Sequence, residues 1–175
     1  MRLFFALWPP ESVAETLAAE AHALAHRFGG KATRRETIHL TLAFLGEVDD
    51  ARLPQVIEAA RGVRARPFEL RIDRLGYWRH NRLIWAGCSA EAPPLRELAD
   101  ALRERLRAAG TPGDEAQGFV PHLTLVRNAR VAAPAELPAL APLVWRCEGF
   151  VLVRSRRTEA GSGYLAVAEF PRGDG

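Results

Sequence analysis

The tetrapeptide His-Leu-Thr-Leu stands at residues 39–42 and again at residues 122–125, once in each half of the 175-residue chain. Both copies lie in runs rich in Thr, Leu, Ile and Val, which predict β-strands over residues 37–44 and 120–126. Side chains alternate between the two faces of a strand, so the His and Thr of each copy share one face and the leucines share the other. We expect the leucines to face a hydrophobic core, and each imidazole and hydroxyl to face the opposite side.

Two such pairs facing each other across a cleft would suit proton transfer. One neutral imidazole can take a proton from a nucleophile while a protonated one gives a proton to the leaving oxygen. The threonine hydroxyls can donate hydrogen bonds to non-bridging oxygens, which suits in-line displacement at phosphorus better than acyl transfer. The alternative is that each pair only caps a sheet edge, as a lone histidine on a strand usually would. We favour the catalytic interpretation because the same four-residue string occurs twice.

The flanks of the two motifs carry a family resemblance. Residues 36–47 read ETIHLTLAFLGE and residues 121–127 read PHLTLVR, and both closely resemble the motifs of the two-histidine (2H) phosphoesterases. The nearest branch resembles the RNA 2′,3′-cyclic phosphodiesterases, also known as 2′-5′ RNA ligases. The likeness extends to residues 2–10, to residues 82–87 and to the late strand with Ser155 and Tyr164, so it covers nearly the whole chain.

The fold class follows from the order of elements. Strands joined by short turns, with helices between them, predict an α+β protein with antiparallel sheets. The resemblance implies a bilobal fold in which two antiparallel β-sheets line a central cleft, with helices packed outside and a pseudo-two-fold internal repeat. Residues 1–175 would then form a single two-lobed domain with one HxTx motif in each lobe.

The resemblance also implies roles for five residues. His39 would be the proton donor and His122 the proton acceptor, although the near-symmetric repeat cannot by itself tell acid from base. Thr41 and Thr124 would bind the phosphate oxygens. Arg127, three residues beyond the second Thr, would contact the phosphate; a surface salt bridge is the alternative for this arginine.

The activity implied is metal-independent hydrolysis of an RNA 2′,3′-cyclic phosphate end to a 2′-phosphate, with 2′-5′ RNA ligation as a possible reverse reaction. The expected partners are RNAs with such ends, tRNA halves among them, and the protein is expected to be a monomer. Two alternatives stay open. One is a phosphodiesterase that acts on 2′-5′ linkages or on another cyclic nucleotide phosphate, and the other is a non-catalytic RNA-end binding module.

Composition limits the class of protein. Hydrophobic residues make up 48% of the chain and charged residues 26%, as in ordinary soluble globular proteins. The formal net charge is +3, and nearly all of the basic residues are arginines, which bind phosphate through two parallel hydrogen bonds. No Walker loop or GxGxxG motif is present, so no cofactor is predicted.

Cysteine usage and the first residues suggest a location. Cys88 and Cys147 belong to no metal-binding pattern and are expected to be buried, reduced thiols. The apolar run over residues 3–8 is too short for a signal sequence and ends at two prolines. We therefore expect a cytoplasmic protein without a membrane segment.

Other segments suggest further elements and ligand contacts. Apolar spacing predicts helices that begin after Pro10, near Leu53 and at Pro93. It also predicts a buried first strand over residues 2–8 and strands over residues 68–78, 82–89, 145–154 and 164–170. Three aromatic residues in the predicted hairpin are candidates either for stacking on a nucleobase or for the core: Tyr77, Trp78 and Trp85. The basic residues 31–35 could lie beside the cleft or in a solvated loop. His22 and His26, one helical turn apart, are expected to be partly exposed helix residues rather than metal ligands.

Overall fold

The computed structural model describes residues 1–64, 66–111, 113, 118–158 and 161–171. In chain order, its helices and strands are β1 (Arg2–Leu7), α1 (Glu11–Phe28), β2 (Lys31–Ala32), β3 (Leu40–Glu47), α2 (Leu53–Arg61), β4 (Phe68–Ile72), β5 (Arg74–Trp78), β6 (Leu83–Gly87), α3 (Pro93–Ala108), β7 (Leu123–Arg127), β8 (Leu143–Cys147), β9 (Gly149–Thr158) and β10 (Gly161–Pro171). The three helices lie where their apolar spacing predicted them. Within these residues, no helix combines the length and apolar character needed to cross a membrane.

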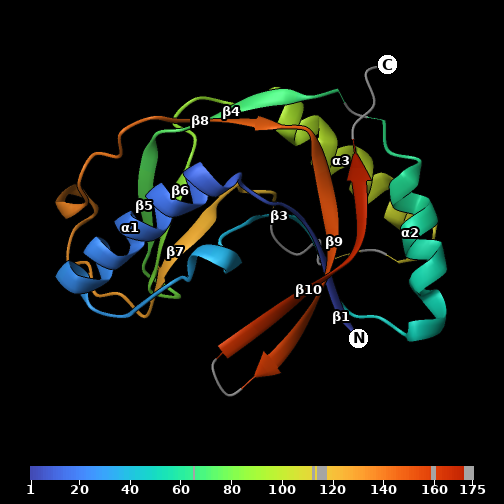
Figure 1. Ribbon diagram of the computed structural model, residues 1–175, viewed down its shortest axis with the longest axis horizontal. Helices are drawn as coiled ribbons and strands as arrows, with labels where there is room; N and C mark the ends of the chain where they lie inside the picture. Colours follow the sequence, from blue (N-terminus) through green and yellow to red (C-terminus); the bar gives the residue numbers. More distant parts are fainter. Residues whose placement is uncertain (65, 112, 114–117, 159–160, 172–175) are drawn as a thin grey trace.

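The main sheet runs in the order β10-β9-β1-β3-β7-β6-β5, and the short strand β2 pairs with β7. Every strand pair in it is antiparallel. Its centre is narrow, because β3 and β7 are joined only through the pair Leu40 and Leu123. Each half of the sheet therefore carries one of the two motifs, and the predicted α+β fold with antiparallel sheets is confirmed (Figure 1).

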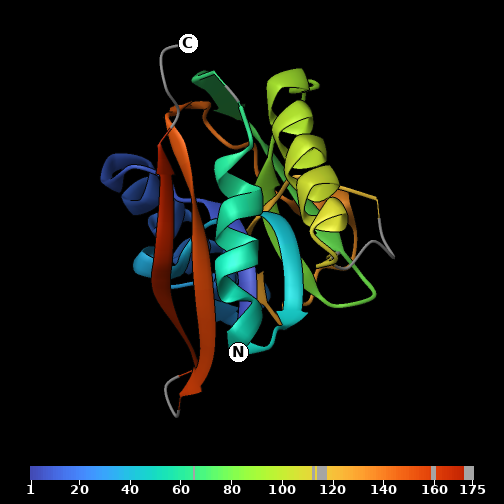
Figure 2. The ribbon, with the colours of Figure 1, turned by 90° about the vertical axis from the view of Figure 1, so that its right-hand side faces the viewer.

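Helices cover the two halves of the sheet separately. Helix α1 packs on β7 and β2, whereas α2 and α3 pack together over β3 and β10. In Figure 1, α1 lies over the half that contains β5, β6 and β7, and α2 and α3 lie beyond β9 at the other side. Figure 2 shows α2 and α3 side by side, with the long β9–β10 hairpin next to them.

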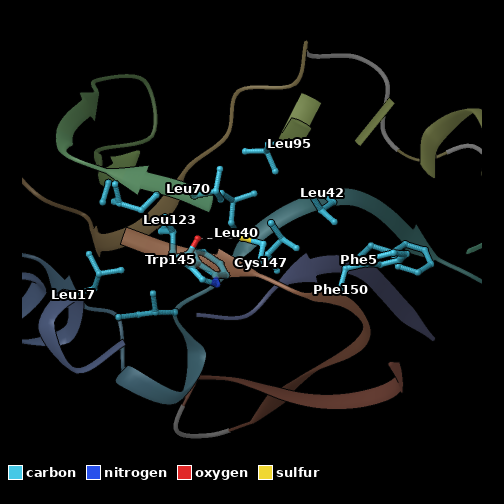
Figure 3. Packing of buried hydrophobic residues seen from close by; sticks show 14 of the residues in the cluster. Phe5, Leu17, Leu40, Leu42, Leu70, Leu95, Leu123, Trp145, Cys147 and Phe150 are labelled. Carbon is cyan, nitrogen blue, oxygen red and sulfur yellow. Dashed lines mark hydrogen bonds between the residues drawn. The ribbon is translucent and has the colours of Figure 1, made fainter. Parts of the chain in front are cut away.

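The leucines of both motifs form the centre of the core. Leu40, Leu42, Leu123 and Leu125 are all 0% exposed, as their alternation in sequence predicted. Figure 3 shows Leu40, Leu42 and Leu123 among side chains from distant parts of the chain. Truncating a leucine in such a position to alanine typically costs about 2–5 kcal/mol.

Two of the predicted strands are divided in the structure. Residues 68–78 form β4 and β5, which belong to different sheets, because the chain turns at Asp73. The Asp73 carboxylate holds this corner by accepting hydrogen bonds from the backbone N–H and the hydroxyl of Ser89. Residues 145–154 divide in the same way, since β8 pairs with β4 in a separate two-stranded sheet and β9 continues in the main sheet.

The motif strands begin later than predicted. Both begin at the leucine after the histidine, at Leu40 and Leu123, and not at residues 37 and 120. A 3₁₀ turn over Arg35–Thr37 precedes the first motif. Each histidine therefore stands just before a strand, where its ring can bond to the chain segment that leads into the sheet.

Candidate active site

The cleft of the main sheet collects all five residues predicted to act on a phosphate. His39, Thr41, His122, Thr124 and Arg127 line one hollow of about 830 Å³. Both motifs alternate between a fully buried leucine and a partly exposed His or Thr. Since β3 and β7 are antiparallel, the His and Thr that flank Leu40 run in the opposite order to the pair that flanks Leu123. The strand pairing therefore places two imidazoles and two hydroxyls around one space.

Each histidine is held by a backbone carbonyl two residues before it. His39 Nδ1 lies 2.8 Å from the Thr37 carbonyl oxygen, and His122 Nδ1 lies 2.9 Å from the Val120 carbonyl oxygen. A carbonyl oxygen can only accept a hydrogen bond, so Nδ1 carries the hydrogen and donates it in both rings. Nε2 is then the atom of each ring that can gain or lose a proton.

Aromatic rings surround His39. The Trp8 indole stacks on the imidazole, with 5.0 Å between centroids and 15° between planes. Phe4 lies 5.0 Å away and the edge of Tyr164 5.3 Å away. Burial removes water from the ring and is the main reason why the pKa of His39 falls from 6.5 to about 4. The Thr37 carbonyl opposes this shift, while the charges of Arg127 and His122 add to it.

His122 has a more open setting. The Trp78 ring meets it edge-on at 4.5 Å, and Trp78 in turn packs against Trp85. Gly76 makes room for Trp85, because a Cβ at this glycine would lie 2.1 Å from the indole Cζ2. Burial is again the main cause of a lowered pKa, here that of His122. The hydrogen bond to the Val120 carbonyl opposes this shift, and the Arg127 charge adds to it.

The cleft favours an anion. Its lining includes Arg2, Arg127, Arg154 and Arg156, and among the described residues Glu47 is the one carboxylate that lines it. That carboxylate lies 3.6 Å from the amino group of Met1 and is partly offset by it. Arginine binds phosphate through two parallel hydrogen bonds, so the walls match a phosphate group in charge and in geometry.

Several candidates from the sequence lie elsewhere. The Tyr77 hydroxyl donates to the Ala129 carbonyl at 3.1 Å, and Trp85 is buried at 8% exposure, so both have structural positions. In the basic segment, Arg35 pairs with Glu11 and Glu15 and not with the cleft. Trp78 does line the cleft.

The helix histidines and the two cysteines lie outside the catalytic cleft. His22 and His26 are exposed, as expected. Among the residues that the structure describes, no group of three or more His, Cys, Asp or Glu is arranged to hold a metal ion. Cys147 is buried as predicted, whereas Cys88 is only half-buried; both are free thiols.

Sequence reasoning missed most of the cleft walls. Phe4 and Trp8 were expected in a buried first strand, yet both contact the imidazole of His39. Strand β1 is apolar on both faces, so alternation gave no signal there. The pairing of Ala6 with Thr41 shows which face of β1 is turned to the cleft. Arg154 comes from β9, which pairs with the edge of β1 opposite to β3. No local sequence pattern indicates that β9 lies beside β1.

Comparison with known proteins defines the family. The sequence pattern of the 2′-5′ RNA ligase superfamily matches residues 9–159. The chain belongs to this superfamily. The family predicted from the two motifs is thereby confirmed.

Relatives in the superfamily are similar over most of their length. The RNA 2′,3′-cyclic phosphodiesterase of Thermus thermophilus is 34% identical over 181 residues, which cover 97% of this chain and 89% of the relative. The enzyme of the same name from Escherichia coli is 33% identical, over 78% and 77% of the two chains. The crystal structure of E. coli LigT complexed with 3′-AMP superimposes with a TM-score of 0.89 at 27% identity, covering 98% of this chain and 97% of the other.

Proposed function

We propose that this protein is an RNA 2′,3′-cyclic phosphodiesterase, which hydrolyses a 2′,3′-cyclic phosphate end to a 2′-phosphate. The observation that carries the proposal is the pair of His-Thr motifs on adjacent antiparallel strands, facing one arginine-lined cleft. The names of its superfamily relatives agree with this activity. RNAs with cyclic phosphate ends, tRNA halves among them, would be the substrates, and the protein would act as a monomer.

The reaction needs one proton acceptor and one proton donor. His122 Nε2 takes a proton from water, and the resulting hydroxide attacks phosphorus. The P–O3′ bond breaks, and His39 Nε2 gives its proton to O3′, which leaves a 2′-phosphate and a 3′-hydroxyl. In each turnover the two histidines together gain one proton and lose one. The same steps in reverse, with an RNA 5′-hydroxyl in place of water, would join two RNA ends.

The second requirement is to stabilise the negative charge that develops on the phosphate oxygens when hydroxide attacks phosphorus. Thr41 and Thr124 donate hydrogen bonds to the two non-bridging oxygens from opposite strands. Arg127 lines the same cleft and supplies a positive charge, which lowers the pKa of both imidazoles. Donors that are already in place where negative charge develops are the largest single contribution to many enzymatic rates.

The assignment of His39 as donor depends on the substrate. The pKa of His39 is about 4, so the ring is neutral at pH 7. A bound phosphodiester places a negative charge beside it, which favours the protonated ring. The same negative charge acts on His122, and the proton donor is the imidazole whose protonated form it stabilises more.

Hydrolysis of a short RNA with a 2′,3′-cyclic phosphate end, followed in single turnover with EDTA present, tests the proposal. We expect conversion to the 2′-phosphate by the wild type and its loss in His39→Ala and His122→Ala, with the folded state of each variant checked by circular dichroism. Binding of the RNA by a folded wild type without turnover would point instead to the non-catalytic RNA-end binding module. Turnover that EDTA abolishes would exclude a metal-independent reaction.

A further inference from the structure

A second hollow of about 430 Å³ opens beside the catalytic cleft. The walls of the two spaces share five residues, Thr41, Phe44, Trp78, Asn81 and His122, so the second one begins at the place proposed for the phosphate. Its outer walls come from the β5–β6 hairpin, from α3 and from the segment that leads into β7. The four residues there that matter for binding are His80, Arg103, Phe119 and Val120.

These walls combine flat rings with polar donors. Trp78 and His80 lie nearly parallel, with 6.3 Å between centroids and 29° between planes. In the walls formed by α3 and the segment before β7, the Arg103 guanidinium lies 4.8 Å above the Phe119 ring. The same guanidinium donates to the Leu42 carbonyl at 3.2 Å, which holds it in place at the edge of the motif strand.

Exposure indicates that this surface is open to a ligand. Val120 is an apolar side chain that is 54% exposed, next to Phe119. Rings that stack, a guanidinium plane and a side-chain amide are the groups with which proteins bind unstacked RNA bases. A hollow of this size is also within the range of small-ligand sites.

We propose that this hollow, which we call the second-base site, binds the nucleobase of the nucleotide that precedes the terminal one. The inference rests on the proposed function. The terminal nucleotide must place its phosphate between the histidines, and the larger, arginine-lined cleft has the volume for its sugar and base. The adjoining hollow is then one step along the chain, and a mononucleotide substrate leaves it empty.

Chain length of the substrate tests this directly. We would measure kcat/KM for a nucleoside 2′,3′-cyclic phosphate, for a dinucleotide and for a trinucleotide with the same cyclic end. We expect about a tenfold gain from mononucleotide to dinucleotide and little more for the trinucleotide, since stacking of one base in an aromatic site has about this size of effect.

Two variants locate the gain. Phe119→Leu keeps an apolar side chain but removes the ring, and His80→Ala removes an exposed ring at the hairpin tip. Both should lose most of the dinucleotide gain and leave mononucleotide hydrolysis unchanged. Arg79→Ala is the matched control, because Arg79 is the neighbour of His80 but donates to the Ala132 carbonyl at 2.9 Å.

The outcomes separate this proposal from the proposed function. An equal loss on the mononucleotide and the dinucleotide would overturn the second-base site, and so would a wild type without any dinucleotide gain. A wild type that hydrolyses no cyclic phosphate would instead contradict the proposed function itself.

Discussion

The two motifs have the same four residues and the same backbone hydrogen bond, but different surroundings. Each ring donates through Nδ1 to a carbonyl two residues earlier, at 2.8 and 2.9 Å. His39 is then enclosed by three aromatic rings, whereas His122 meets the edge of Trp78. A duplicated motif thus sets the positions of two equivalent groups, and the residues that surround each copy make them chemically unequal.

Loss of either imidazole should have the largest effect. We expect His39→Ala and His122→Ala each to lower the single-turnover rate by about 10²–10⁴-fold, the usual contribution of general acid–base catalysis. The double variant should lose far less than the product of the two, because the two groups act in one proton-transfer sequence.

A sulfur substrate distinguishes donor from acceptor. When sulfur replaces O3′, the leaving group is a thiolate, which needs no proton because thiols ionise near pH 8.5. The variant of the proton donor should then regain most of its rate, and the variant of the acceptor should not. Recovery by His122→Ala and not by His39→Ala would reverse the roles proposed here.

The pH dependence of folding should differ between the two histidines. Because the pKa of His39 in the folded protein is about 4, below its value of 6.5 in the unfolded chain, the unfolded chain binds the proton first as the pH falls. The stability that the neutral ring provides is complete above pH 6.5 and is lost progressively between pH 6.5 and 4, by roughly 3 kcal/mol in all.

Urea unfolding at pH 7.5 and pH 4.5 measures this loss. The His39→Gln variant should lose less stability than the wild type over this interval, since it has no ring to protonate. His122→Gln provides the comparison. It should change the pH dependence of stability less than His39→Gln does, because the imidazole of His122 is less completely buried. We call the rings of Phe4, Trp8 and Tyr164 around His39 the aromatic cage. An identical pH dependence in wild type and His39→Gln would show that this cage does not exclude the charged imidazole.

Much of this arrangement could be predicted from the sequence, because short-range periodicity determines it. The alternation of leucine with His and Thr predicted which side chains are buried, and Pro10 and Pro93 marked two helix starts. The walls of the cleft depend on which strands pair. Phe4 faces His39 only because β1 lies beside β3, and Tyr164 only because β9 and β10 follow on the other side of β1. Such pairings join residues far apart in the sequence, as Ala6 pairs with both Thr41 and Val151, and they have no local signal.

The two threonines should be close to equal, in contrast to the histidines. We expect Thr41→Val and Thr124→Val each to lower kcat/KM by about tenfold, the cost of one hydrogen bond to a charged oxygen. Val has nearly the shape of Thr, so packing should change little. Serine at either position should restore the rate, and a loss that serine does not restore would indicate a packing role for the methyl group.

Opening the aromatic cage should reduce the difference between the two rings. Trp8→Leu removes the indole that stacks on His39 and admits water to one face of the imidazole, so the pKa of His39 should rise toward 6.5. NMR titration of the two imidazoles would follow each ring separately. Trp78→Leu is the matched change on the other side, and it should raise the pKa of His122 and leave that of His39 nearly unchanged. If Trp8→Leu moves both rings equally, the two share one environment. If it moves His39 alone, the neighbours of each motif, and not the motif itself, set its proton affinity.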